Sequence, residues 1–304
     1  MGVVMVSREA RVEIDRLFAE RKPDRPLEQR RREWEAEARL AVLPREARFT
    51  SETAGGVKCE WMEMPRVARD RVFLFFHGGG YNAGSPRTHR PLAANLSRAT
   101  HMRLLLPDYR LAPENPFPAG VKDALLVYQW LLNQGYSEDN ILVGGDSAGG
   151  GLTLSMLLAL RAAGARMPKA AILLAPWTDL TASSGSYQKL RKFDPIITHE
   201  GLREAGLMYA GKRDPADPLL SPLFADPTGL PPMLIHVGGD EVMLDDSRRF
   251  AERATAAGVP VTYKLFDGMW HVFHTAGQAV PEARLAIEEI GGFVRALYAE
   301  VETV

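Results

Sequence analysis

The sequence predicts an α/β fold in which a mostly parallel central sheet is flanked by helices. Short apolar runs of strand length alternate with longer stretches whose apolar residues recur at helical spacing. Repeated strand–helix units of this kind form parallel sheets with helices on both faces. The chain has 304 residues, 46% of them hydrophobic, and a formal net charge of -1. This composition is globular and gives no electrostatic case for nucleic acid or an anionic membrane as a partner.

Two amphipathic helices are predicted within residues 7–43, separated by Pro23 and Pro26. A hairpin follows from about residue 47, with its turn at 54–56. The strand–helix alternation then begins, with predicted strands at 71–76, 102–107, 140–145, 170–177, 231–239 and 261–266, and helices at 121–135, from 147 onward, 247–258 and 281–300.

Two polar helical pieces fall outside this alternation, the N-terminal helices and an insertion after the strand at 170–177. Both are candidates for a lid over the sheet. We therefore expect an N-terminal helical cap segment (1–45), a first part of the core (46–180), an inserted helical cap segment (181–215) and a second part of the core (216–304).

The stretch Gly145-Asp146-Ser147-Ala148-Gly149 has the pattern G-x-S-x-G between a predicted strand and a predicted helix. It could be a phosphate-binding loop, a packing turn or the turn that presents a nucleophile. No lysine follows the glycines as a P-loop requires, and G-x-G-x-x-G fits only loosely. A nucleophile turn needs flanking glycines for space and a helix whose first N–H groups face developing negative charge. This context favours Ser147 as a nucleophile.

A serine nucleophile needs a histidine base and an acid that orients it. On an α/β sheet of this kind the partners follow the serine in the order acid, then histidine. His271 comes after the last predicted strand and is the expected base, whereas His274 suits packing or a supporting role. His236 lies within a strand pattern and is expected in the core.

Four acidic residues follow the predicted strand at 231–239. Asp240 comes directly after the strand and is the expected acid, ahead of the alternatives Glu241, Asp245 and Asp246. The last two precede a helix, where carboxylates cap or complement the N-terminus.

The glycine run at 77–80 follows the strand at 71–76 and leaves backbone N–H groups free to bind a ligand. Alone, it reads equally well as a glycine turn beside a core histidine. Ala148, the residue after the serine, can supply a further N–H group. Together with the serine turn, the run indicates an oxyanion hole.

Several motifs occur in order from about residue 40 to the C-terminus: HGGG at 77–80, DYRLAPENPFPAG at 108–120, GDSAGG at 145–150, DPLLSPLFAD at 217–226, the Asp240 segment and His271. With them the chain resembles the bacterial hormone-sensitive-lipase-like carboxylesterases of the α/β-hydrolase superfamily. The resemblance implies an α/β-hydrolase fold with a helical cap, a triad of Ser147, Asp240 and His271, and oxyanion donors at Gly78, Gly79 and Ala148. Family members often read His-Gly-Phe at the catalytic histidine, whereas this chain has valine at position 272.

The resemblance also implies a serine carboxylesterase that hydrolyses small to medium acyl esters through an acyl-enzyme. Tyr81, Met208 and Tyr209 are the expected pocket residues, although cap packing explains them equally well. The alternatives are a hydrolase of lactones or amides and a non-catalytic small-molecule receptor; the presence of all three triad residues favours an enzyme. No cofactor is expected, and no metal, because the histidines lack H-E-x-x-H or similar spacing.

The single cysteine, Cys59, excludes an intramolecular disulfide framework and is expected to be a packed residue in a reducing compartment. The N-terminus lacks the apolar run of a signal peptide, and the longest apolar run, LTLSMLLAL, is too short to span a membrane. We expect a cytoplasmic protein without membrane insertion. The resemblance also allows a homodimer.

Overall fold

The computed structural model describes residues 6–21 and 25–299 of the chain. Within them, one sheet has the strand order β1-β2-β4-β3-β5-β6-β7-β8. The β1–β2 and β2–β4 pairs are antiparallel, and the remaining pairs are parallel. The strands are β1 (Arg48–Ala54), β2 (Val57–Glu63), β3 (Ala68–Phe76), β4 (Met102–Pro107), β5 (Ile141–Asp146), β6 (Ala170–Leu174), β7 (Met233–Gly238) and β8 (Val261–Phe266). The predicted mostly parallel sheet and its N-terminal hairpin are confirmed.

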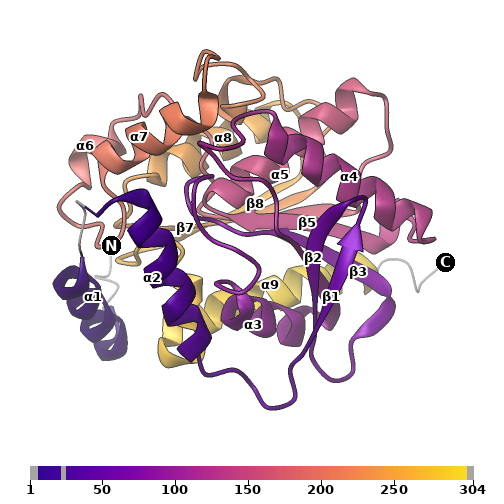
Figure 1. Cartoon of the computed structure of the whole chain (residues 1–304), viewed down its shortest axis with the longest axis horizontal. Coiled ribbons are helices and arrows are strands. Elements are labelled where there is room, and N and C mark those ends of the chain that lie inside the picture. Colours follow the sequence, from indigo (N-terminus) through magenta and orange to yellow (C-terminus); the bar gives the residue numbers. More distant parts are fainter. Residues whose placement is uncertain (1–5, 22–24, 300–304) are drawn as a thin grey trace.

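Helices cover both faces of the sheet (Figure 1). Along β3, Leu74 and Phe76 join one apolar cluster while Phe73 and Phe75 join the other, as expected where successive side chains point to opposite faces. The first cluster includes α4 (Ala119–Asn133), α5 (Ala148–Ala162) and α8 (Leu244–Ala256), and the second includes α3 (Arg90–Thr100) and α9 (Pro281–Ala299). Burial on both faces explains why the central strands are continuous apolar runs.

Both segments outside the strand–helix alternation are helical, as predicted. They contain α1 (Arg8–Glu20) and α2 (Leu27–Leu40), then α6 (Ser186–Lys189) and α7 (His199–Ala210). Pro26 directly precedes α2, whereas Pro23 lies outside the described residues. All four helices lie on the same side of the molecule (Figure 1). Arg21 joins the two segments, since its Nη2 donates to the carbonyl of Ile197 at 3.0 Å.

The remaining helical elements are short 3₁₀ turns. The turns are η1 (Glu138–Asn140), η2 (Pro222–Phe224) and η3 (Phe273–Ala279). No helix in the described part of the chain has the length and apolarity needed to cross a membrane. Cys59 is buried in β2, as expected of a packed residue.

Candidate active site

Ser147 occupies the turn between β5 and α5 in a strained backbone conformation. Its φ of 52° and ψ of -122° lie in a region that non-glycine residues rarely adopt. Three backbone hydrogen bonds hold it there: its N–H donates to Leu174 at 2.8 Å, and its carbonyl accepts from Gly151 at 3.1 Å and Trp177 at 2.9 Å. The serine therefore caps α5, where the helix directs its first N–H groups toward negative charge.

The glycines around Ser147 are required because strand and helix approach closely. A Cβ atom at Gly145 would lie 2.5 Å from the carbonyl oxygen of Phe76, and one at Gly149 would lie 2.0 Å from the same oxygen. The end of β3 thus presses against the first turn of α5 and leaves no room for a methyl group. This close packing explains why glycines flank Ser147 in the G-x-S-x-G pattern.

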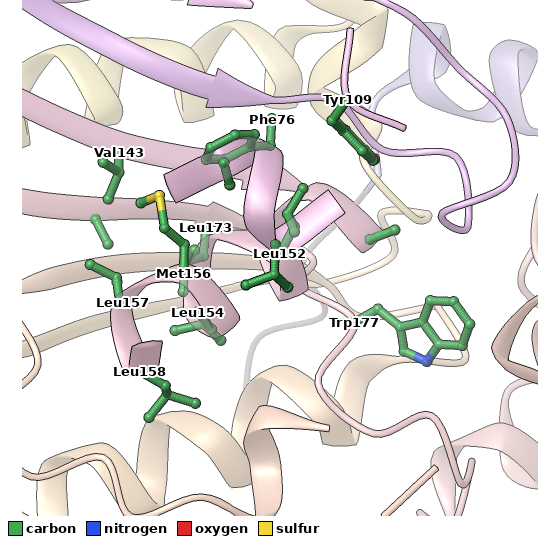
Figure 2. Packing of buried hydrophobic residues seen from close by; sticks show 14 of the residues in the cluster. Phe76, Tyr109, Val143, Leu152, Leu154, Met156, Leu157, Leu158, Leu173 and Trp177 are labelled. Carbon is green, nitrogen blue, oxygen red and sulfur yellow. The ribbon is translucent and has the colours of Figure 1, made fainter. Parts of the chain in front are cut away.

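The helix behind the serine is anchored in the main apolar cluster. Leu152, Leu154, Met156 and Leu157 of α5 have no exposed surface. They pack among side chains from the sheet and the following loop, including Val143, Leu173 and Trp177 (Figure 2). A helix fixed in this way holds its N-terminal residue in one position, which a nucleophile requires.

His271 lies in the loop after β8 and is paired with a carboxylate. Its Nδ1 is 3.4 Å from Oε1 of Glu241, and its Nε2 has no hydrogen-bond partner among the described residues. The imidazole and the carboxylate are 4% and 0% exposed. Burial alone would lower the pKa of His271, but the Glu241 charge and hydrogen bond outweigh burial and raise the pKa above 6.5. The free Nε2 atom can therefore accept a proton.

The carboxylate beside His271 belongs to Glu241 rather than to the predicted Asp240. The chain after β7 continues to pair with the loop that carries the histidine: Gly239 N–H donates to Phe266 at 2.8 Å, and Asp240 N–H donates to Met269 at 2.9 Å. This pairing leaves the half-buried Asp240 carboxylate without a hydrogen bond to the imidazole, which the next residue reaches instead. Glu241 also accepts from the Gly238 N–H at 3.2 Å.

The other acids and histidines weighed from the sequence have different partners. Asp245 accepts from the backbone N–H of Ser186, and Asp246 accepts from those of Thr178 and Asp179. Both acids lie in the first turn of α8, which begins three residues before its predicted start at 247. His236 and His274 are fully buried, with Nδ1 of the first 3.2 Å from Nε2 of the second. The predicted core position of His236 is confirmed.

The oxyanion loop offers a set of free N–H groups that is shifted by one residue from the predicted set. Gly78 N–H donates to Oδ1 of Asp146 at 3.0 Å, so it is already engaged. The N–H groups of Gly79, Gly80 and Ala148 have no acceptor in the described ranges. The available donors therefore include the predicted Gly79 and Ala148, with Gly80 in place of Gly78.

The three predicted pocket residues meet where the oxyanion loop contacts α7. The rings of Tyr81 and Tyr209 stack with centroids 3.7 Å apart and an interplanar angle of 2°. Both side chains are buried, and neither hydroxyl has a hydrogen-bond partner in the part of the chain that the structure describes. Nδ2 of Asn82 donates to the sulfur of Met208 at 3.6 Å. The residue after the glycine run therefore packs directly on the inserted segment.

Ser147 and His271 follow strands of the same parallel block, β5-β6-β7-β8, so both lie at its carboxyl edge. No hydrogen bond joins their side chains in the described structure; such contacts are often long before substrate binds. No group of three or more His, Cys, Asp or Glu side chains among the described residues could hold a metal ion.

The chain is similar to several known proteins. A family model described as alpha/beta hydrolase fold matches residues 73–275. An acetyl-hydrolase of Streptomyces hygroscopicus is 41% identical over 243 residues, covering 80% of this chain and 81% of that protein. A crystal structure of an esterase from the bacterial hormone-sensitive lipase family superposes with a TM-score of 0.93 at 40% identity, covering 97% and 99% of the two chains. A structure of EstE5 soaked with p-nitrophenyl butyrate has a TM-score of 0.93 at 38% identity, covering 96% and 99%.

Proposed function

Because the chain belongs to the bacterial hormone-sensitive-lipase family of alpha/beta hydrolases and is a carboxylic ester hydrolase, we propose that Ser147, His271 and Glu241 form its catalytic triad. The observation that carries this proposal is the buried His271–Glu241 pair, whose free Nε2 atom belongs to a loop at the same sheet edge as the strained serine.

The proposed reaction proceeds in two steps through one covalent intermediate. Nε2 of His271 takes the Ser147 hydroxyl proton as Oγ attacks the ester carbonyl, and Glu241 stabilises the imidazolium. The tetrahedral intermediate collapses, the imidazolium protonates the leaving alcohol, and an acyl-serine remains. Water then attacks the acyl-serine, giving its proton to His271. The second collapse releases the acid and returns the proton to Ser147.

The negative oxygen of each tetrahedral intermediate needs donors that are in place beforehand. We assign this role to the N–H groups of Gly79, Gly80 and Ala148, which lack acceptors in the described residues. Two belong to the turn at 79–83, which is closed by hydrogen bonds from the Asn82 and Ala83 N–H groups to the Gly79 carbonyl at 3.2 and 2.9 Å. A closed turn does not have to reorganise as charge develops.

The substrates we propose are esters with short acyl groups. The acetyl-hydrolase among the relatives supports a short acyl chain. The rings of Tyr81 and Tyr209 stack and are buried directly after the glycine run, where we expect them to limit the length of the acyl chain. The N-terminal and inserted helices would act as a cap over this site, with Arg21 and Ile197 joining them.

The alternatives carry less support. A catalytic triad does not determine which leaving group is accepted, so hydrolysis of lactones or amides is a second reaction to assay. A receptor role would not require the intact Ser147, His271 and Glu241 set. A cytoplasmic location and a homodimer stay predictions from the sequence.

Hydrolysis of a p-nitrophenyl ester series from acetate to decanoate tests the proposal, with wild type and Ser147→Ala measured in parallel. We expect the highest kcat/KM at acetate or butyrate and a loss of about 10⁶-fold in kcat for the variant. Ser155→Ala is the control, because this buried serine of α5 donates only to the carbonyls of Gly151 and Leu219. Wild type that is inactive on every ester, or Ser147→Ala that keeps its rate, would refute the proposal.

A further inference from the structure

The inserted segment holds the backbone of Val242, the residue that follows Glu241, at both its N–H group and its carbonyl group. The N–H group of Val242 donates to Oδ2 of Asp194 at 2.9 Å. Its carbonyl accepts a hydrogen bond from Oγ of Ser186 at 2.7 Å. Both partners belong to residues 181–215, outside the strand–helix core. Backbone next to the proposed acid is thus fixed by side chains of the cap.

Asp194 is itself rigidly held. Its side chain has no exposed surface, and its Oδ1 accepts from the N–H groups of Ile196 and Ile197, both at 2.9 Å. Three backbone N–H donors therefore stabilise this buried carboxylate, and no Lys, Arg or His side chain among the described residues forms an ion pair with it. A charged acceptor with three donors is a strong and directional tether.

Ser186 supplies the second tether and connects it to α8. Its hydroxyl accepts from the Asp245 N–H at 3.2 Å, and its own N–H donates to Oδ2 of Asp245 at 3.0 Å. The hydroxyl that holds the Val242 carbonyl is therefore oriented by the backbone on its other side. Like Asp194, it is buried, with 3% of the residue exposed.

We propose that Asp194 and Ser186 are positioning residues that set the carboxylate of Glu241 against His271 through the backbone of Val242. This inference rests on the proposed function, in which Glu241 is the acid. The Glu241–His271 separation of 3.4 Å is already at the long end for a hydrogen bond, so a small displacement of the Val242 peptide weakens it further. Apart from His271, the described structure gives the Glu241 carboxylate only the Gly238 N–H as a hydrogen-bond partner.

The first test is steady-state kinetics of Asp194→Asn and Ser186→Ala on p-nitrophenyl butyrate. An asparagine keeps the shape of Asp194 but presents an NH₂ group to one of the N–H donors, so one tether is lost. We expect kcat to fall about 10- to 100-fold for Asp194→Asn and about 3- to 10-fold for Ser186→Ala, with KM within about 2-fold. The milder serine variant keeps the test informative if the aspartate variant folds poorly.

Asp123→Asn is the control, because Asp123 is also a buried carboxylate (4% exposed) that accepts from the backbone N–H of Arg110 at 2.9 Å; it also pairs with the Arg110 guanidinium at 2.7 Å. It should lose stability yet keep kcat within about 2-fold. If Asp194→Asn and Ser186→Ala both keep the wild-type kcat, the inference is overturned.

The second test repeats Asp194→Asn in a Glu241→Gln background. If Asp194 acts through Glu241, its substitution should change kcat less than about 2-fold once the acid is gone. An equal loss in both backgrounds overturns the inference while leaving the proposed function intact. If Glu241→Gln alone leaves kcat unchanged, the proposed acid fails and the inference fails with it.

Discussion

Replacing Glu241 with glutamine tests which of two adjacent carboxylates orients the proposed catalytic base, His271. The glutamate is fully buried, and its oxygen lies 3.4 Å from Nδ1 of His271. At an effective dielectric constant of about 20, two unit charges at this distance attract by about 5 kcal/mol. Above the pKa of His271 the imidazolium forms only as the serine loses its proton, so this attraction stabilises the transition state more than the ground state. At about 1.4 kcal/mol per factor of ten, the loss of kcat should be roughly 10³- to 10⁴-fold.

Asp240→Asn provides the matched control at the neighbouring position. Its carboxylate makes no hydrogen bond to His271, and its backbone N–H, which donates to Met269, is unaffected by the change. We expect kcat within about 3-fold of wild type. The assay is kcat on p-nitrophenyl butyrate, with thermal unfolding of each variant to confirm that it is folded. A loss of about 10³-fold in Asp240→Asn with full activity in Glu241→Gln would refute the assignment.

Two further predictions concern pH dependence and packing at the serine turn. Only neutral His271 can accept a proton, so kcat/KM should fall about tenfold per pH unit below the pKa of His271, which Glu241 raises above 6.5. In Glu241→Gln this fall in kcat/KM should begin at a lower pH. An unchanged pH profile would contradict the pairing of His271 with Glu241. Gly149→Ala should destabilise the fold by about 3 kcal/mol in urea unfolding, because its Cβ would lie 2.0 Å from the Phe76 carbonyl oxygen. Gly120→Ala, whose Cβ would meet nothing closer than 3.4 Å, should gain about 0.5 kcal/mol, and equal effects of the two substitutions would refute the packing argument.

The fold was predictable because its strands and helices carry independent local signals. β5 is buried along its whole length and reads as a continuous apolar run, while α5 is too long for a strand and follows a glycine turn. The positions of Ser147 and His271 at one edge of the sheet were predictable for a related reason. Each comes after a well-marked strand, where a parallel sheet gathers functional side chains at one edge.

The acid was not predictable to the residue because two candidates are adjacent. Asp240 and Glu241 follow the same strand, and the choice depends on how far the chain keeps pairing with residues 266–269 before it turns away. That pairing joins segments nearly thirty positions apart, and no pattern within either segment reports it. Only the difference in side-chain length between aspartate and glutamate distinguishes the two candidates in the sequence.

The replacement of Gly78 by Gly80 among the proposed oxyanion donors also has a long-range cause. Three consecutive glycines offer three N–H groups, and the sequence does not indicate which are free. The Asp146 carboxylate accepts from the N–H group of Gly78, so that N–H group is not free. Nε2 of His89 lies 3.3 Å from the same carboxylate. The residue before the nucleophile thereby ties the serine turn to the oxyanion loop. Holding these two loops together fixes the proposed oxyanion donors relative to the proposed nucleophile, Ser147.

Valine at position 272 shows that this chain keeps the backbone typical of a glycine without having one. Val272 has a φ of 51° and a ψ of 41°, a left-handed conformation that is strained by roughly 1–2 kcal/mol in an L-residue. The residue is buried, with 7% of its surface exposed, and burying a valine contributes about 1.5 kcal/mol or more. The two contributions are similar in size and opposite in sign. The valine is therefore accommodated by packing in the loop that places Nδ1 of His271 3.4 Å from Oε1 of Glu241.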